Sequence, residues 1–474
     1  MHVTRIALAA AAILLATARV SAADAEMLKD FQQTIDEVLK SHYEAGQGRT
    51  LSETARIAYG AYTTFAYLSA DDVAGEARGF GEVDAKFWMH AETAGHKFYG
   101  RLRLLYENFD SGDAFTASGD GLVEPIFDRY WYRFDWRLDE QAETGADPGW
   151  GWWVQVGRQY VSWVSGMTLS DPLYAARAGV ETRSFSVDAL FGVTPDHFID
   201  FDGSRPSYTS DTDRYFFGIS AECRSLRNHR PFVYVLWQED ENTQPFGSAG
   251  PQYHYDSRYA GAGSTGEIGT GVWLYRLELI YEFGESISDT LAAPPQTVDD
   301  IEAYAIRFFV AYMPPGARQR IGLRVEAEVL VGSGDDDRGA SSQTAGGNLA
   351  GTNDTSFISF GYVNTGLALG PELSNLVAVR LTGSAFPLRG RGLFDRMRAS
   401  LSGFVFAKYD DNAPISVPTV FGESLVGGEV DLALDWQLTS DLNLLLQYGI
   451  FLPGDAMADS DPLHFFYVGF SYGF

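Results

Sequence analysis

The chain has 474 residues, of which 14% are aromatic and 50 are glycine, and its formal net charge is −28. This acidic balance argues against a nucleic-acid partner, because phosphate backbones are bound by an excess of lysine and arginine. The single cysteine, Cys223, excludes an intramolecular disulfide framework. Past the first 23 residues no apolar stretch reaches the ~20 residues that a membrane-spanning helix needs. No cofactor or metal site is predicted.

The first residues have the pattern of a bacterial secretory signal. Residues 2–5 are weakly basic, residues 6–17 form an apolar run rich in alanine and leucine, and Val20-Ser21-Ala22 places small side chains before a cleavage site. We therefore expect residues 1–23 to be removed and the mature protein to be exported.

Residues 24–50 are predicted to form a helical segment. Leu28, Phe31 and Ile35 recur at spacings of three and four with polar residues between them, and Gly46 ends the pattern. We expect a short periplasmic helix that packs at the mouth of the following domain. A plug inside that domain is the alternative.

Residues 51–474 change to a period of two. In residues 126–138, for example, Tyr130, Tyr132 and Phe134 lie on one face and charged side chains lie on the other. Strands of this kind are expected at 57–68, 83–93, 98–109, 126–138, 150–162, 180–191, 214–224, 230–239, 271–283, 301–313, 320–331, 355–367, 375–386, 396–409, 425–438, 441–452 and 462–474.

Large aromatic faces opposite ionic faces indicate a membrane wall with a wet interior. A soluble β-sandwich also alternates, but it would need far more protein to cover such faces. We therefore predict an all-β fold, a transmembrane antiparallel β-barrel of about 18 strands (16–18), wide enough to leave an aqueous lumen. The last strand supports this prediction, since Phe466, Phe470 and Phe474 share a face and a terminal phenylalanine resembles the signal that outer-membrane assembly reads.

Two further stretches resemble the alginate export family of outer-membrane barrels. One is Gly428-Glu429-Val430-Asp431-Leu432 followed by Tyr448-Gly449-Ile450-Phe451-Leu452-Pro453-Gly454, which is similar to the penultimate hairpin of that family. The other is Val156-Gly157-Arg158-Gln159 with Asp213–Ile219 downstream. The resemblance runs from about residue 97 to the end. It implies a monomeric eighteen-stranded barrel that passes an anionic polysaccharide outward through an arginine-lined constriction.

The predicted inward face carries many arginines. Two segments, 98–109 and 126–138, have more inward arginine than carboxylate, so the preferred pathway residues are Arg101, Arg103, Arg129, Arg133 and Arg137. The resemblance adds Arg158 and Arg214. The remaining inward cations are Arg276, Arg320, Arg324, Arg380, Arg398 and Lys408. Arginine suits carboxylated sugars because its planar fork binds a carboxylate through two hydrogen bonds. Cross-strand ion pairs with inward carboxylates are the alternative role for most of these residues.

These patterns predict an outer-membrane channel for anionic solutes, with an anionic polysaccharide exporter as the leading hypothesis. A general or small-solute porin is the alternative. An outer-membrane enzyme is not favoured, because no histidine has a Ser or Asp partner at a recognisable spacing. The expected partners are outer-membrane lipids, an anionic polysaccharide or small anionic solute, and periplasmic export proteins.

Three smaller predictions concern loops and aromatic residues. Residues 240–268, rich in glycine, are expected to form a loop that folds into the lumen as a constriction. Acidic turns such as 335–337 are interpreted as solvated rather than as calcium sites. Aromatic residues near strand ends are interpreted as interfacial girdles, in preference to platforms for sugar rings.

Overall fold

The computed structural model describes residues 35–37, 40, 55–71, 77–110, 120–195, 212–241, 254–269, 272–288, 296–338 and 348–474. The predicted secretory signal lies outside the described residues. Within these ranges, none of the helices has the length and apolar character to cross a membrane.

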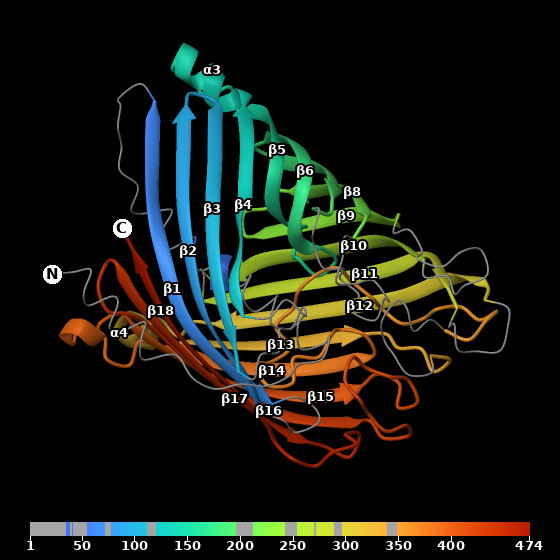
Figure 1. The fold of residues 1–474 in the computed structure, drawn as a ribbon. Helices are drawn as coiled ribbons and strands as arrows, with labels where there is room; N and C mark the ends of the chain where they lie inside the picture. The colour runs from blue at the N-terminus through green and yellow to red at the C-terminus, as the bar shows by residue number, and fades with distance from the viewer. Residues whose placement is uncertain are drawn as a thin grey trace.

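Eighteen antiparallel strands form one closed sheet (Figure 1). Each strand pairs with the next along the chain, and β1 closes the ring by pairing with β18, with Tyr62 opposite Gly473 and Ala70 opposite Phe465. The first nine strands are β1 Arg56–Asp71, β2 Ala77–Thr93, β3 His96–Phe109, β4 Gly121–Asp135, β5 Trp150–Ser162, β6 Ser170–Thr182, β7 Phe185–Val193, β8 Arg214–Cys223 and β9 His229–Asp240. The others are β10 Tyr255–Ile268, β11 Trp273–Ile287, β12 Val298–Tyr312, β13 Arg324–Gly332, β14 Leu376–Ala385, β15 Met397–Lys408, β16 Leu425–Gln437, β17 Leu442–Pro453 and β18 Leu463–Gly473. The predicted antiparallel barrel is confirmed.

Three segments differ from the predicted pattern. The strand expected at 355–367 does not form. The strand expected at 180–191 is divided between β6 and β7 by a turn at 183–184. Part of the loop expected at 240–268 is β10, and residues 242–253 lie outside the described residues.

The two ends of the barrel differ in their connections. At one end, here called the turn end, β2–β3, β6–β7 and β16–β17 are joined by two to four residues. Two helices also lie at this end, α3 (Trp136–Thr144) between β4 and β5 and α4 (Pro315–Ile321) between β12 and β13. The opposite end, here called the loop end, has the longer connections, including residues 333–375 between β13 and β14.

The outer face of the barrel is apolar. On β11, Leu277, Leu279 and Tyr281 are exposed, while the alternating residues Glu278 and Glu282 are buried toward the interior. The same alternation exposes Phe308 of β12, Val379 and Leu381 of β14, Leu401 and Val405 of β15, Leu432 of β16, and Phe466 and Phe470 of β18. An apolar band on the outside of a closed sheet is the surface that a lipid bilayer requires.

Aromatic side chains gather on the outer face near the turn end. The ring centroids of Trp273 and Tyr312 are 4.3 Å apart, and those of Phe98 and Tyr132 are 4.7 Å apart. Trp273 is the first residue of β11 and Tyr312 the last of β12, and Phe98 and Tyr132 lie within four residues of the turn end of β3 and β4. Their position is that of an interfacial girdle, as interpreted from the sequence.

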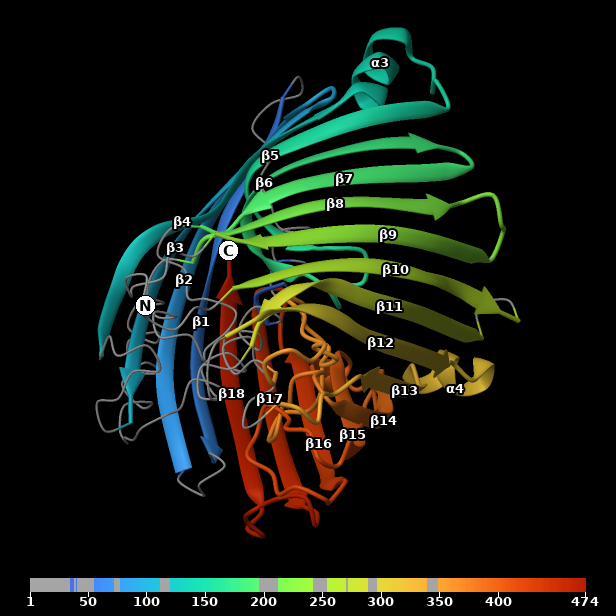
Figure 2. The ribbon, with the colours of Figure 1, turned by 90° about the vertical axis from the view of Figure 1, so that its right-hand side faces the viewer.

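The interior is partly filled from the loop end (Figure 2). Residues 348–375, here called the lumen segment, pair with the tip of the β5–β6 hairpin. The N–H of Ser170 donates to the carbonyl of Phe360 at 2.9 Å, and the N–H of Phe360 donates to the carbonyl of Thr168 at 3.2 Å. Leu169 and Phe360 are both buried in the main apolar cluster. Among the described residues the lumen segment thus enters the interior, while residues 242–253 of the expected constriction lie outside the described residues.

Two buried carboxylates of the wall hold the lumen segment in place. The backbone N–H groups of residues 367–369 donate to the carboxylate of Glu429 on β16 at 2.5, 2.7 and 3.0 Å. The N–H of Ile358 donates to Glu282 on β11 at 3.0 Å, and Tyr255 donates to the same carboxylate at 2.7 Å. Each bond satisfies a backbone group that would otherwise be buried without a partner. The lumen segment is therefore anchored to the wall at β11 and at β16.

The ladder between β4 and β5 is short. The two strands pair only from Tyr130 opposite Arg158 to Asp135 opposite Trp153, whereas β1 and β2 pair along their full lengths. At the end of this ladder Gly157 has a φ of 134°, a conformation that side chains with a Cβ rarely adopt. Beyond it, β5 and β6 leave the wall and curve toward the interior (Figure 1).

Candidate functional site

Two of the predicted pathway residues bind the chain's own N-terminal segment. The described residues of the predicted helix, 35–37 and 40, are helical and lie against the inner face of β1–β4. Nη2 of Arg101 lies 2.7 Å from Oδ2 of Asp36, and Nη2 of Arg129 lies 3.2 Å from the same oxygen. Lys86 also pairs with Asp36, and Arg129 pairs with Glu37. The position agrees with the alternative interpretation, a plug in the lumen, rather than with a helix at the mouth.

The electrostatics of this contact favour an ionised Asp36. Burial alone would raise the pKa of the Asp36 carboxyl, but the charges of Lys86, Arg101 and Arg129 together hold it well below its usual range. Tyr62 of β1 lies next to the carboxyl, with its hydroxyl 3.5 Å from Oδ1. A buried carboxylate surrounded by cations stays charged.

Arg103 and Arg133 are paired within the wall. Nε of Arg103 donates to Asp84 of the neighbouring strand β2 at 3.0 Å. Arg133 lies 3.3 Å from Asp135, two residues away on β4, and its guanidinium lies 4.1 Å from the ring centroid of Trp153. Arg103 has the cross-strand role that the sequence left open as the alternative, whereas Arg133 pairs within its own strand.

The prediction that Arg137 faces the lumen is wrong. β4 ends at Asp135, whose side chain accepts a hydrogen bond from the N–H of Leu138 and so caps α3. Arg137 lies on that helix at the turn end, where it pairs with Asp147 at 2.7 Å. Arg320 was likewise expected on an inward strand face but lies on α4.

The two arginines added by the resemblance have different environments. Arg158 is buried and lies opposite Tyr130 and Tyr174, with its guanidinium 5.7 Å from the ring centroid of Tyr174. Arg214 is fully buried. It lies 3.5 Å from Asp240 and 5.1 Å from the ring centroid of Phe360 in the lumen segment.

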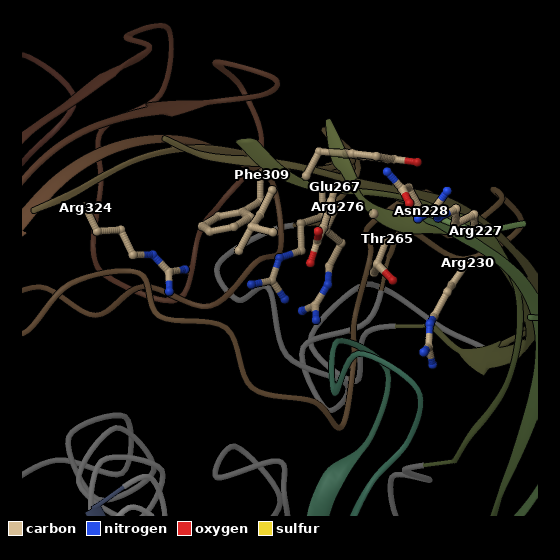
Figure 3. A pocket seen from close by; sticks show the side chains of 12 residues that line it. Arg227, Asn228, Arg230, Thr265, Glu267, Arg276, Phe309 and Arg324 are labelled. Carbon is tan, nitrogen blue, oxygen red and sulfur yellow. The ribbon is translucent and has the colours of Figure 1, made fainter. Parts of the chain in front are cut away.

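A pocket rich in arginine opens inside the barrel near the turn end (Figure 3). It has a volume of about 580 Å³ and is lined by the strands from β9 to β13. Figure 3 shows the side chains of Arg230, Arg276 and Arg324 pointing into the same space. Arg227 and Arg307 also line it, so five arginines face one carboxylate, Glu267.

The arginines of this pocket differ in how they are compensated. Arg307 donates to Glu328 at 2.7 Å, and Arg324 and Arg230 form ion pairs with Glu326 and Glu222 at 2.5 and 3.4 Å. Arg276 of β11 has no carboxylate within 4 Å among the described residues. Its charge is therefore available to a solute.

A second hollow adjoins this pocket through Arg324. Its volume is about 750 Å³, and its lining includes Arg318 of α4 and Arg389 of the β14–β15 connection. The basic surface thus continues from the pocket to the edge of the turn end.

The sequence identified part of this pocket. Arg276 and Arg324 were placed on the inward face, and the structure confirms both positions. Arg230 and Arg307 were missed, although Arg307 alternates with outward Phe308 on β12 and could have been found from that period. The convergence of five strand and turn arginines at one end depends on register, which the pattern of a single strand does not specify.

The similarity of this chain to known proteins lies in the barrel. Residues 144–469, more than half of the chain, match the family model described as Alginate export. The chain belongs to the alginate export family. No curated protein matches it.

Solved structures of similar fold come from Pseudomonas aeruginosa. OccK5 (OpdH) superposes with a TM-score of 0.55 at 10% identity, covering 90% of this chain and 99% of that one. The outer membrane protein OpdK gives 0.52 at 12% identity, with 90% and 100% covered, and OccK8 (OprE) gives 0.53 at 9% identity, with 90% and 99% covered. At these identities the likeness concerns the fold.

Family and fold together are those of an outer-membrane channel and not of an enzyme. In barrels of this kind the short turns face the periplasm and the long loops face outward. The arginine pocket of this alginate export family member therefore lies on the periplasmic side, and the lumen segment lies toward the outside.

One group of carboxylates outside the pathway was considered in the sequence. Oxygens of Asp335, Asp336 and Asp337 lie within 4.8 Å of one another. Asp335 accepts hydrogen bonds from the N–H groups of Asp337 and Thr355, both at 2.9 Å. Its carboxylate is therefore used to order the start of the β13–β14 connection.

Proposed function

We propose that this barrel passes anionic polysaccharide and that the chain enters from the periplasm through the arginine pocket. The observation that carries the proposal is the charge of that pocket, five arginines against one carboxylate in a chain of net charge −28. A basic patch inside a low-dielectric wall concentrates anions at the point where it lies.

The chemistry of the pocket suits carboxylated sugars. Arg276 has no carboxylate within 4 Å among the described residues. A guanidinium binds a carboxylate through two parallel hydrogen bonds. Phe309 lines the same pocket and offers apolar contact beside the cations. Arg230, Arg307 and Arg324 are each shared with a wall carboxylate, which weakens their hold on a solute. Conduction requires such a balance, because a solute must bind well enough to enter and weakly enough to leave.

Outward movement requires a supply of polymer on the periplasmic side. A passive channel takes its direction from the concentration gradient, so we propose that periplasmic export proteins deliver the chain to the turn end. The basic edge formed by Arg318 and Arg389 is the part of the barrel that such a polymer would meet first.

A channel for small anionic solutes is the second candidate. The observation that favours it is the lumen segment, which is packed between the β5–β6 hairpin and the wall and narrows the barrel near the loop end. A polymer needs this segment to move, whereas a small anion needs only a path beside it.

The proposal is tested by ion selectivity in planar bilayers. We expect the purified protein to be anion-selective, with current blocked by polymannuronate and not by a neutral polymer of equal length. Arg276→Glu should weaken the block about 10- to 100-fold, since a hydrogen bond to a charged group contributes about 1.5–3 kcal/mol. Arg183→Glu is the matched control, because Arg183 lies in the exposed β6–β7 turn at the same end of the barrel and does not line the pocket.

The outcomes separate the two candidates. Block by polymannuronate together with transport of long uronate chains supports polysaccharide passage. Transport that stops at one or two sugar residues supports the small-solute channel. Cation selectivity that Arg276→Glu does not change would reject both.

A further inference from the structure

We infer that Lys86, Arg101 and Arg129 form a carboxylate-binding site on the inner wall, that Asp36 and Glu37 of the N-terminal segment occupy it, and that a carboxylated sugar displaces them. The inference rests on the proposed passage of anionic polysaccharide and adds a second site to it. The segment would then act as a plug that the transported solute itself releases.

The contacts of Asp36 are those expected for a bound anion. One carboxylate receives three cations from three different strands, Lys86 of β2, Arg101 of β3 and Arg129 of β4. Nη2 of Arg101 at 2.7 Å and Nη2 of Arg129 at 3.2 Å share the same oxygen.

The charges show why the site needs an anion. Lys86 is also shared with Asp84 at 2.9 Å, and Arg101 is also shared with Asp128, whose Oδ1 lies 3.0 Å from Nε. Arg129 differs, because both carboxylates that it contacts among the described residues belong to the N-terminal segment. Removing the segment would leave Arg129 without a carboxylate partner among the described residues. Exchange for another carboxylate avoids that state, so release by a ligand is favoured over simple undocking.

Aromatic side chains surround the cations. Tyr62, Trp88 and Tyr99 form a small cluster on the inner wall, and Ile35 of the N-terminal segment packs against it. The ring of Tyr99 stacks on that of Trp131, with centroids 5.5 Å apart. Flat apolar faces beside cations are suited to a uronate, whose ring has an apolar face and whose carboxylate lies at its edge. Ile35 and Asp36 occupy these two parts of the site in the structure.

The test measures the mobility of the segment directly. A nitroxide label is placed by Lys40→Cys in a Cys223→Ser background, so that it is the only cysteine and lies one helical turn after Asp36. We expect a three-residue oligomannuronate to convert the label from a slow to a fast spectrum in a saturable manner. A neutral mannotriose at the same concentration should leave the spectrum unchanged.

A double variant that removes both carboxylates tests the site without a ligand. In Asp36→Asn/Glu37→Gln the fast fraction should rise about tenfold or more, because two carboxylates are lost from three cations. Glu140→Gln/Glu143→Gln on α3 is the matched control, since it changes the net charge equally on a helix that has no buried residue. Glu37→Gln alone, at a half-exposed residue, is a milder variant, and heat-dependent gel migration verifies that every barrel is folded.

The outcomes distinguish this inference from the proposed function. A slow spectrum in the double variant overturns the inference. So does a label that stays slow at oligomannuronate concentrations that block the current, and in that case the proposed function stands. A label released by oligomannuronate in a barrel that is cation-selective supports the carboxylate site and rejects the polysaccharide channel.

Discussion

Arg129 and Asp36 lie 93 positions apart in the chain and meet inside the barrel, where Nη2 of the arginine is 3.2 Å from Oδ2 of the carboxylate. The partner of this wall arginine is therefore a separate segment rather than a neighbouring strand. Each cation on this part of the wall has a carboxylate, but only Arg129 depends on the N-terminal segment for it among the described residues. The state of the segment and the charge of the lumen are linked through this residue.

Replacing Arg129 should release the segment. Arg129→Met keeps the length of the side chain but removes its bonds to Asp36 and Glu37, which contribute about 1.5–3 kcal/mol to docking. We expect a larger open fraction in single-channel recordings. Arg133→Met is the control. Arg133 lies four residues further along β4 on the same face, and it pairs with Asp135 and with no described residue of the segment. Equal open fractions in the two variants would contradict the role of Arg129.

Acid should release the segment only when the pH falls below the usual pKa range of a carboxyl group. The pKa of Asp36 is lowered in the docked state, where it faces Tyr62, Lys86, Arg101 and Arg129, and is about 3.9 when free. A lowered pKa means that docking is stabilised fully above the free pKa and is lost as the pH falls through the docked one. The fast fraction of a spin label at position 40 should stay constant from pH 8 to about pH 5 and rise at lower pH.

Two wall carboxylates that share these cations have to be separated from Asp36 in this experiment. Asp84 and Asp128 neutralise part of the same cations from the wall. In Asp36→Asn the acid response of the label should be smaller, and the difference from the parent isolates Asp36. A response of equal size in both proteins would assign it to the wall carboxylates instead.

Glu429 should control the lumen segment. Its carboxylate accepts three backbone N–H groups from residues 367–369, and Glu429→Ala leaves all three buried without a partner, at about 1–3 kcal/mol each. We expect higher conductance and proteolytic cleavage within residues 348–375 while the barrel stays folded. Asp435→Ala lies on the same face of β16 and should behave as the parent. Resistance to protease equal to that of the parent would show that other contacts hold the segment.

The barrel could be predicted from the sequence because its signal is local. On β11 the alternation of Leu277, Leu279 and Tyr281 with Glu278 is visible without any knowledge of neighbouring strands. β10 was missed because its inner positions carry glycine. A Cβ at Gly261 would lie 2.2 Å from the ring of Tyr234, so the glycine makes room for an aromatic residue of the adjacent strand. Such a reason appears only when two strands are considered together.

The site was predicted less completely than the fold. Alternation placed Arg101 and Arg129 correctly on the inner wall, but their partner Asp36 belongs to a helical segment whose docking is a tertiary event. Arg137 was misplaced because the charged residues after Asp135 continue the strand period by chance, while the capping side chain starts a helix. Ion pairing, which decides which arginines meet a solute, depends on register and distance rather than on composition.

The seam between β4 and β5 should depend on Gly157. Its φ of 134° and its close approach to β4, where an added Cβ would lie 2.2 Å from the carbonyl oxygen of Tyr130, leave no room for a side chain. Gly157→Ala should cost at least the ~1–3 kcal/mol of a strained backbone, in a ladder of only six residue pairs. We expect a lower midpoint for thermal unfolding in detergent, followed by heat-dependent gel migration. Gly403→Ala on β15 is the control, because a Cβ there meets nothing within 4 Å. If both variants unfold at the parent's temperature, the bend of β5 into the lumen does not rely on this glycine, and the seam is held by the packing of the hairpin tip against the lumen segment.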